Sequence, residues 1–233
     1  MHDSYISAPW ILTQLRGTRG HAQAMSYWTY SDLFEEPSPP NAALHGGFGL
    51  MTRDGIRKPA WFAYKYLNAL RGNEVPSADK TLLAARDGNK AAVVVWNWQH
   101  PEQPNQQWRL FRQAGPHAAA PTVTLNLRNV SAGTYRVQVR RTGHKVNDAD
   151  TTYLEMGSPK DLNEGQLNKL HALTADKSEV DQVHRDAKQV KLRCGALGPF
   201  AFWLGLNDIE HRLQFIPGKT QFVAQAWFDR RTC

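Results

Sequence analysis

The hydrophobic pattern of this chain changes its period once, and this change limits the folds available to it. Before Gly72 the apolar residues recur at helical spacing, whereas after Ala78 they alternate as in β-strands. The segment between them, GNEVPSA, contains Gly, Pro and Ser, which interrupt regular structure. We therefore predict a domain boundary there, with an α/β part over residues 1–75 and an all-β part over residues 76–233. A complete (β/α)8 barrel needs about 250 residues, so it does not fit into the 233 residues beside a second domain.

The first part predicts a helix, a strand, a long loop and a second helix. The expected bounds are residues 4–15, 24–30, 31–55 and 59–71. Asp3 or Ser4 is the expected N-cap of the first helix, and Pro59 stands at the first position of the second. Residues 24–30 (AMSYWTY) form a short apolar run, which is typical of a strand covered on both faces. The loop contains three prolines and a glycine cluster at residues 45–49 (HGGFG), a composition that suits a shaped surface.

The second part predicts short strands and one inserted helix. The expected strands are residues 81–86, 91–98, 123–127, 135–139, 189–194, 200–206 and 221–228. The turn at Asp87–Asn89 joins the first two strands into a hairpin. The helix covers residues 161–173, with Asp161 and Glu164 at the spacing of a capping box. Short strands with this turn punctuation predict an antiparallel β-sandwich.

Composition and charge exclude several classes of function. The 28 Lys and Arg against 21 Asp and Glu give a net charge of +7, but the basic residues are scattered among acids, so we expect a solvated surface and no nucleic-acid partner. No run approaches the roughly 18 apolar residues of a membrane span, and no leader pattern opens the sequence. Localisation stays open. Cys194 and Cys233 make neither a disulfide framework nor a metal site, and we interpret both as free thiols.

Four segments carry a resemblance to a known family. YWTYSDLFEE at residues 27–36 resembles the last-strand motif of glycoside hydrolase family 39, which contains β-xylosidases and α-L-iduronidases. HGGFGLMTRDGIRKPAWFAYKYLNAL at residues 45–70 resembles the glycine loop and closing helix of that family. HDSYISAPWILTQL at residues 2–15 is similar to the segment after its nucleophile strand, and residues 133–167 resemble its accessory β-domain. The resemblance extends through about Leu206.

This resemblance implies a TIM barrel followed by a β-sandwich, and retaining hydrolysis of β-xylosides by two carboxylates. In the family the acid/base lies in an Asn-Glu-Pro motif, and the nucleophile Glu lies on the strand before the segment at which this sequence starts. Neither motif occurs here. The chain then supplies only the last helices and the eighth strand of an incomplete barrel. We expect no catalytic residue, no cofactor and no activity of the chain alone, and activity would return only with a second chain that supplies the missing strands.

The resemblance also implies the substrate-binding residues: Trp28, Phe34, Glu35, Glu36 and His45. Trp28 is the stacking platform for a xyloside or xylo-oligosaccharide, and Glu35 or Glu36 accepts hydrogen bonds from sugar hydroxyls. These two acids cannot be the catalytic pair, because adjacent residues of an extended chain point to opposite sides. His45 either faces the sugar or holds the loop. Gly46, Gly47 and Gly49 serve the backbone shape, since glycine permits positive φ.

Further features have both a structural and a functional interpretation. Trp96 and Trp98 share one face of a strand, and we expect core packing there rather than a carbohydrate-binding stripe. His144, Asn147 and Asp148 are polar, but no spaced histidine pair supports a metal, so we predict none. The alternative function is a noncatalytic β-sandwich module that binds carbohydrate or protein, with residues 1–72 as a docking arm. A nonfunctional remnant is the third possibility.

Overall fold

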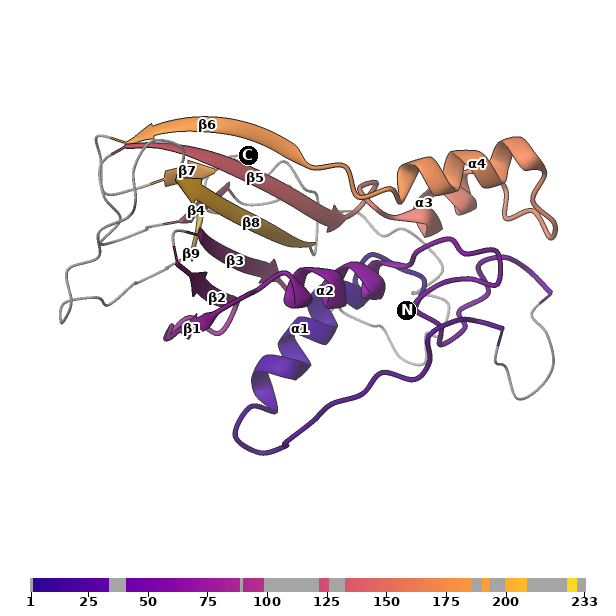
Figure 1. The fold of residues 1–233 in the computed structure, drawn as a ribbon. Helices are drawn as coiled ribbons and strands as arrows, with labels where there is room; N and C mark the ends of the chain where they lie inside the picture. Colours follow the sequence, from indigo (N-terminus) through magenta and orange to yellow (C-terminus); the bar gives the residue numbers. More distant parts are fainter. Residues whose placement is uncertain are drawn as a thin grey trace.

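The structure is a computed structural model that describes residues 2–33, 41–88, 90–98, 122–125, 133–185, 190–192, 200–208 and 226–229. Two helices come first, and nine strands with two further helices follow them within these residues (Figure 1). The helices are α1 (Ser7–Gly17), α2 (Pro59–Asn68), α3 (Ala149–Glu155) and α4 (Glu164–Leu173). The strands are β1 (Asn73–Val75), β2 (Leu82–Asp87), β3 (Lys90–Asn97), β4 (Thr122–Leu125), β5 (Gly133–Gly143), β6 (Glu179–Arg185), β7 (Val190–Leu192), β8 (Phe200–Asp208) and β9 (Ala226–Asp229).

The strands form two antiparallel sheets. The larger sheet has six strands in the order β1-β2-β3-β8-β5-β6, and the smaller has three in the order β7-β4-β9. The predicted hairpin is confirmed, because β2 pairs with β3 in the register that places Asp87 opposite Lys90. β8 then pairs with β3 on one side and β5 on the other, so strands far apart in sequence form the centre of the sheet.

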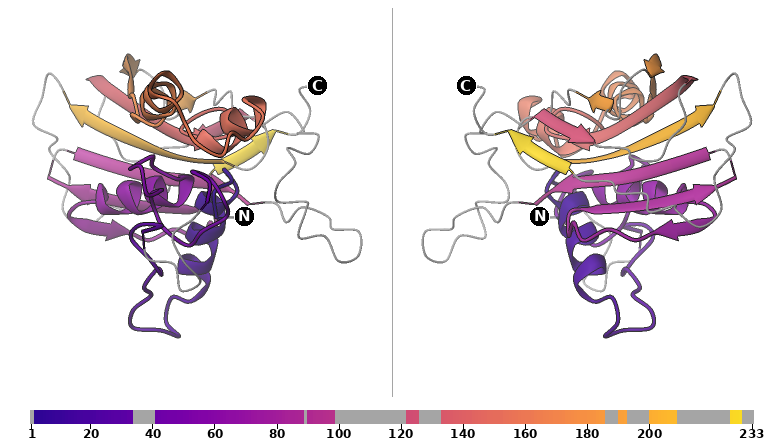
Figure 2. Two further views of the ribbon diagram at one scale, coloured as in Figure 1. Left: turned by 90° about the vertical axis from the view of Figure 1, so that its right-hand side faces the viewer. Right: turned by 90° about the vertical axis from the view of Figure 1, so that its left-hand side faces the viewer.

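Both faces of the larger sheet are buried at its central strand β3. On β3, Val94 and Trp96 belong to one hydrophobic core with residues of α1 and α2, whereas Val93 and Val95 point to the opposite face and are also fully buried. The two views in Figure 2 look at this sheet from opposite sides, with the helices nearer the viewer on the left. Trp96 is fully buried and its indole Nε1 donates to Thr13 Oγ1 at 3.0 Å, so the expected core packing of Trp96 is confirmed. Trp98 packs against the same core and is partly buried.

The first helix is confirmed, but its predicted cap is wrong. α1 begins at Ser7, and its N-cap residue Ile6 makes no side-chain capping bond. The carboxylate of Asp3, which we expected to cap the helix, is instead 2.6 Å from Lys58 Nζ and also accepts the Gly46 N–H. The local pattern could not reveal this, because a carboxylate before a helix looks the same whether it binds the helix or a distant lysine.

The predicted strand over residues 24–30 is also wrong. The structure has no strand there, and the nearest ladder element is an isolated bridge between Ser31 and Met51. A run of apolar residues forms a strand only when neighbouring backbones accept and donate its hydrogen bonds. Among the described residues, no backbone hydrogen bond involves residues 24–27. The segment is extended and largely exposed instead.

The accessory part contains two helices where one was expected. α3 is an additional helix, and its N-cap Asp148 accepts the Thr151 N–H. α4 matches the predicted helix, but the capping box joins Asn163 to Gln166 rather than Asp161 to Glu164. β1 and β6 were not predicted, because NEV is too short and EVDQVHR too polar to read as a strand on their own. Both lie at the edges of the larger sheet, where side chains need less burial.

Some predictions concern residues that the structure does not describe. Cys194 and Cys233 lie outside the described residues, as do residues 34–40 of the long loop. Residues 126–127, 189, 193–194 and 221–225 of three predicted strands also lie outside them. Among the helices that are described, none is long and apolar enough to cross a membrane.

Candidate functional site

Exposed hydrophobic side chains are concentrated in one region of the described chain. Within the described residues six large hydrophobic side chains are exposed, and five of them lie between residues 25 and 48. These five are Met25, Trp28, Tyr30, Leu33 and Phe48. Trp28 and Tyr30 are each 66% exposed, although tryptophan is normally among the more buried residues. Such a concentration of exposed apolar side chains usually marks a surface that contacts a ligand or a protein.

The Trp28 segment is held against the glycine cluster (residues 45–49) and the residues after it. The Thr29 N–H donates to the Phe48 carbonyl at 3.2 Å, and the Leu50 N–H donates back to the Thr29 carbonyl at 2.9 Å. The Asp32 N–H donates to the Met51 carbonyl at 3.0 Å. The chain therefore leaves this ladder at residue 32, passes through the long loop and returns at the glycine cluster. Both ends of the loop lie next to each other.

A buried ionic cluster lies where the two ends of the loop meet. Lys58, which immediately precedes α2, is fully buried, and its Nζ lies 2.6 Å from Asp3 Oδ1 and 2.6 Å from Asp32 Oδ2. The same Nζ donates to the Gly47 carbonyl at 3.0 Å. We call Asp3, Asp32 and Lys58 the Lys58 cluster. Two carboxylates against one ammonium leave it with one surplus negative charge.

The carboxylates of the Lys58 cluster also bind the backbone of the glycine cluster. Asp3 Oδ2 accepts the Gly46 N–H at 2.6 Å, and Asp32 Oδ1 accepts the Gly49 N–H at 2.7 Å. Gly46 has φ +88°, which glycine adopts without strain. A Cβ at Gly49 would lie 2.4 Å from the Asp32 backbone nitrogen, so no other residue fits there. The predicted role of these glycines in backbone shape is thereby confirmed at both positions.

Aromatic rings pack around the first residues of the described chain. His2 makes an edge contact with Phe48 at 5.1 Å between ring centroids, and its Nδ1 lies 3.1 Å from the Tyr27 hydroxyl. Burial lowers the pKa of His2, and burial raises the pKa of Tyr27. Both side chains are thus held neutral near pH 7, which suits an aromatic support for the exposed ring of Phe48.

The inserted helices α3 and α4 support the loop from the accessory part. Ala43, Leu44 and Ile56 form a buried hydrophobic cluster with residues of these helices, Ala149, Tyr153 and Leu170. Asp150 of α3 interacts electrostatically with Asp3 and Lys58 of the Lys58 cluster. Burial, the largest cause, and the neighbouring carboxylates of Asp3 and Asp148 together raise the pKa of Asp150 to about 7, while Lys58 acts in the opposite direction. The insertion thus places a further carboxyl group beside the Lys58 cluster.

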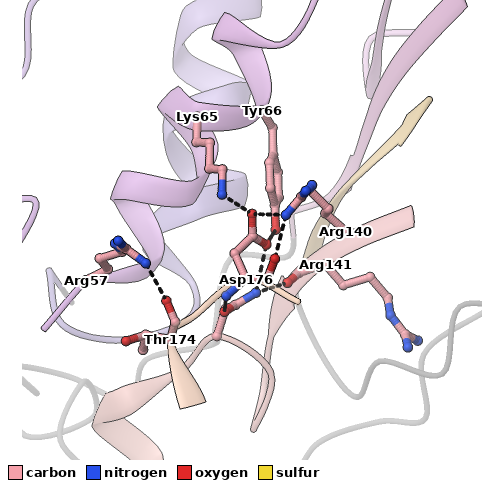
Figure 3. Close-up of polar contacts among 8 residues, drawn as sticks. Arg57, Lys65, Tyr66, Arg140, Arg141, Thr174 and Asp176 are labelled. Carbon is pink, nitrogen blue, oxygen red and sulfur yellow. Dashed lines mark hydrogen bonds and ion pairs between the residues drawn. The ribbon is translucent and has the colours of Figure 1, made fainter. Parts of the chain in front are cut away.

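A second buried cluster joins α2 to the larger sheet (Figure 3). Asp176, which follows α4, is buried and receives the Tyr66 hydroxyl at 2.9 Å and the ammonium of Lys65 at 2.6 Å. Arg140 of β5 lies 3.2 Å from the same carboxylate and also donates to its backbone carbonyl. Asn147 completes this Asp176 cluster by exchanging two hydrogen bonds with Asp176. The cluster fixes α2, and thereby Lys58 at its start, relative to the sheet.

The polar residues that were weighed as metal ligands have structural partners. Asn147 binds Asp176 and the Arg141 carbonyl, and Asp148 caps α3. The His144 ring packs edge-on against Tyr5 at 5.5 Å. In the part of the chain that is described, no group of three or more His, Cys, Asp or Glu side chains is arranged to hold a metal.

A separate cavity of about 480 Å³ lies between the end of α1 and the β1-β2 edge. Its apolar lining includes Leu15, Leu70 and Leu83. Both arginines in its wall are already bound, Arg16 to the Ser77 carbonyl and Arg19 to Glu74. None of residues 45–49 lines this cavity, so it does not adjoin the glycine cluster.

Two of the five predicted substrate-binding residues can be placed. Trp28 is exposed on the segment that leads into the long loop, and His45 is half-buried at its far end. Phe34, Glu35 and Glu36 lie outside the described residues. Sequence reasoning missed Asp32 and Lys58, although both stand inside the motifs that carry the family resemblance. The available signal was a lysine directly before the proline that starts α2. Lys58 occupies the N-cap position, where a side chain usually accepts a hydrogen bond from the helix, and it makes no such bond.

Comparison with known proteins gives a consistent result. The family model for glycosyl hydrolases family 39 matches residues 1–191. A beta-xylosidase of Geobacillus stearothermophilus is 40% identical over 99 residues, which cover 42% of this chain and 19% of the relative. A beta-xylosidase of Caldicellulosiruptor saccharolyticus is 30% identical over 154 residues, which cover 62% of this chain and 28% of the relative.

Solved structures agree with the sequence relatives. The GH39 enzyme from Xanthomonas axonopodis pv. citri is 47% identical with a TM-score of 0.82. A monomeric beta-xylosidase from Caulobacter crescentus CB15 is 43% identical with a TM-score of 0.84. Each match covers 89% of this chain and 42% of the solved one. The chain therefore spans less than half the length of the relatives that it matches.

Proposed function

The chain belongs to glycosyl hydrolase family 39, and from this premise we propose that it forms one wall of a xyloside-binding site in a β-xylosidase-like glycosidase. We define the sugar wall as residues 27–33 together with the glycine cluster. The beta-xylosidase names of the sequence relatives support a xyloside or xylo-oligosaccharide as the substrate class. The exposed ring of Trp28 is the observation that carries the proposal, because a flat aromatic face is what the apolar face of a pyranose stacks on.

The catalytic pair, in this proposal, comes from residues outside the 233. Retaining hydrolysis needs a general acid and a nucleophile whose carboxyl groups are about 5 to 5.5 Å apart across the sugar. Asp3 and Asp32 are ion-paired with Lys58 in a buried cluster, so neither is available to protonate a leaving group or attack an anomeric carbon. The sequence contains no Asn-Glu-Pro motif. We therefore expect the chain alone to be inactive.

Within a complete site, the chain would bind and orient the sugar. Trp28 would stack on one sugar face, and Glu35 or Glu36 would accept hydrogen bonds from its hydroxyl groups, with Phe34 and His45 beside them. The loop that carries these residues would exclude water from that side of the site. The acid and nucleophile on the missing strands would then protonate the leaving oxygen and form the glycosyl-enzyme intermediate.

Residues 1–75, we propose further, are the terminal part of an incomplete TIM barrel whose other strands would cover the Trp28 segment. The exposed side chains of Met25, Tyr30 and Leu33 and the backbone of residues 24–27 support this, since both need a neighbour to satisfy them. Residues 76–233 would be an accessory β-sandwich. The second buried face of the larger sheet supports it, because α1 and α2 cover only one face and the smaller sheet is the available cover for the other.

Sugar binding tests the wall directly. In saturation-transfer NMR, xylobiose should receive magnetisation from the wild-type chain, and Trp28→Ala should abolish the transfer. Val180→Ala is the matched control, because Val180 is 58% exposed on β6, far from the wall in sequence. Equal transfer in wild type and Trp28→Ala would contradict the proposal.

The partner is tested by complementation. The part of the Caulobacter crescentus beta-xylosidase that this chain does not match would be purified and mixed with it. We expect a 1:1 complex that hydrolyses p-nitrophenyl β-D-xyloside, and Tyr30→Glu should prevent its formation, because a charge replaces an apolar contact. Failure of the wild-type chain to form any complex would count against the incomplete-barrel interpretation.

A further inference from the structure

Lys58 is a fully buried lysine whose ammonium contacts all go to the protein. Its Nζ meets Asp3 and Asp32 at 2.6 Å each and the Gly47 carbonyl at 3.0 Å. An ammonium group has three N–H donors and no acceptor. The Gly47 carbonyl accepts one of them, two carboxylate oxygens lie 2.6 Å away as ion-pair partners, and the side chain is fully buried, so the ammonium is not exposed to a sugar hydroxyl. Any contribution of Lys58 to sugar binding must therefore pass through the residues that it holds.

These residues include both ends of the long loop. Asp32 stands immediately before residues 33–45, and Gly46 and Gly47 stand immediately after them. Asp32 on one side and the Gly47 carbonyl on the other bind the same Nζ. Bringing the loop ends together costs conformational entropy. The shared contact with Lys58 offsets this cost in the ligand-free protein, so less of it remains to be met on binding.

The same anchor sets the position of the Trp28 segment. Asp32 accepts the Gly49 N–H through its free carboxylate oxygen, while its own N–H donates to the Met51 carbonyl. A shift of Asp32 would break both bonds and move the residues that precede it. Trp28 lies only four residues before Asp32, on the far side of the Thr29–Phe48 hydrogen bond.

We propose that Lys58 is a positioning residue of the sugar wall, which holds the Trp28 segment and the two ends of the loop in one register. This inference rests on the proposed function, because it assigns Lys58 to the same site. Buried ion pairs add little net stability, since removing the charges from water costs about as much as their attraction returns. Apolar side chains in place of all three charged groups would stabilise the fold as well, whereas an ammonium between two carboxylates and a carbonyl specifies one arrangement of three segments.

Amide hydrogen exchange on the full 233-residue chain separates positioning from general stabilisation. In Lys58→Met we expect exchange at Gly46 and Gly49 to accelerate about tenfold or more, because the carboxylates of Asp3 and Asp32 that accept their N–H groups lose the anchor. Leu50 should follow, because its acceptors Thr29 and Tyr30 precede Asp32 in the same segment. Amides in β3 and β8 that exchange through local fluctuations should keep their wild-type rates, and those that exchange through global unfolding should accelerate only by the loss of unfolding free energy. Equal acceleration at all amides would mean that Lys58 only stabilises the fold, and unchanged rates at the glycine cluster would mean that it orders nothing there. Either result overturns the proposal.

A milder variant keeps the test valid if Lys58→Met does not fold. Asp32→Asn leaves one carboxylate facing one ammonium and retains an oxygen that can accept the Gly49 N–H. We expect roughly threefold faster exchange at Gly49 and Leu50, with β3 unchanged. Lys145→Met is the matched control, because it breaks the exposed Lys145–Glu155 ion pair and should change none of these rates. Unchanged exchange at Gly49 in Asp32→Asn would also overturn the proposal.

Xylobiose binding distinguishes failure of this inference from failure of the proposed function. If the wild-type chain binds xylobiose and folded Lys58→Met binds it at least about fivefold more weakly, both the proposed function and the positioning role of Lys58 are supported. If the two bind equally, the positioning role is wrong and the proposed function stands. If the wild-type chain does not bind, the proposed function is wrong, and the exchange rates alone decide whether Lys58 orders the loop.

Discussion

The Lys58 cluster and the Asp176 cluster both join carboxylates to basic side chains, with opposite charge balance. The first places one lysine between two carboxylates, and the second places one carboxylate between a lysine and an arginine. All members of the first are buried, with side chains at most 7% exposed, whereas the cations of the second reach solvent with side chains 34% and 26% exposed. The fully buried Lys58 cluster anchors an irregular loop, and the partly exposed Asp176 cluster joins α2 to β5.

The difference shows how the two parts of the chain are held in place. The larger sheet is fixed by continuous backbone ladders and by apolar packing on both faces, so the Asp176 cluster adds only a connection to α2. The Trp28 segment and the glycine cluster have few backbone bonds and expose their aromatic rings. Their geometry therefore depends on a small number of buried charges.

The largest effect is expected at the centre of the Asp176 cluster. Asp176→Ala leaves Lys65 and Arg140 facing each other without a carboxylate, and removes the acceptor of the Tyr66 hydroxyl. Losing the buried partner of such a pair costs about 3 to 5 kcal/mol of unfolding free energy, toward the lower value here because both cations reach solvent. Urea denaturation measures it. A loss below about 1 kcal/mol would mean that the cluster does not join the two parts.

Lys58→Met should cost about 3 kcal/mol of unfolding free energy, because the carboxylates of Asp3 and Asp32 are then buried without a cation. Urea denaturation measures this loss alongside that of Asp176→Ala. A loss below about 1 kcal/mol would contradict the role of the cation in the Lys58 cluster.

Asp150→Asn tests whether a charge at Asp150 of the insertion is penalised by burial and by the neighbouring carboxylates. Burial, together with Asp3 and Asp148, raises the pKa of Asp150 to about 7 in the folded protein, above the ordinary value of 3.8, so the folded state binds more protons between these limits. The wild-type protein should lose stability as the pH rises from about 4 to about 7. The substitution removes this loss and should stabilise the chain at pH 8 by on the order of 2 kcal/mol. Thermal unfolding at pH 5 and pH 8 checks it, and destabilisation at pH 8 would be the contrary result.

Tyr66→Phe removes one hydrogen bond from the Asp176 cluster and leaves its charges in place. The hydroxyl donates to Asp176 Oδ1 at 2.9 Å in a buried position. We expect a loss of about 1 kcal/mol in urea denaturation, because Lys65, Arg140 and Asn147 still satisfy the carboxylate. A loss as large as that of Asp176→Ala would show that the hydroxyl, and not the cations, holds the cluster together.

Trp28→Ala should have the smallest effect on stability and the clearest effect on binding. The side chain is 66% exposed, so its removal should change the unfolding free energy by no more than about 0.5 kcal/mol. Xylobiose binding should nevertheless be lost. A stability loss above about 2 kcal/mol would instead make Trp28 a packing residue.

The regular parts of this fold were predictable from the sequence, and the irregular parts were not. The β2-β3 hairpin follows from alternation and a short turn, and α2 begins at the proline that predicted it. Residues 24–30 have the composition of a strand, but a strand also needs backbone partners, which composition does not report. α3 was missed because seven residues are too few for a clear helical period.

The ionic clusters could not be found by local patterns. Tyr66 and Asp176 are 110 residues apart, and no spacing rule joins them. Asp3 has two plausible local roles, and only the fold shows that it binds Lys58. Trp28 and the glycine cluster were found through the family resemblance rather than through any periodicity. The candidate binding residues of the loop therefore come from motifs, while the residues that support the loop are found only in the structure.

The central claim is that this chain carries a wall of the sugar site and not its catalytic pair. Hydrolysis of p-nitrophenyl β-D-xyloside by the purified 233-residue chain tests this most directly, with Trp28→Ala and Glu36→Ala measured alongside. The account predicts no release of p-nitrophenol above the buffer rate for all three proteins. Turnover by the wild-type chain that falls in both variants would contradict it, and would place a catalytic carboxylate within these residues.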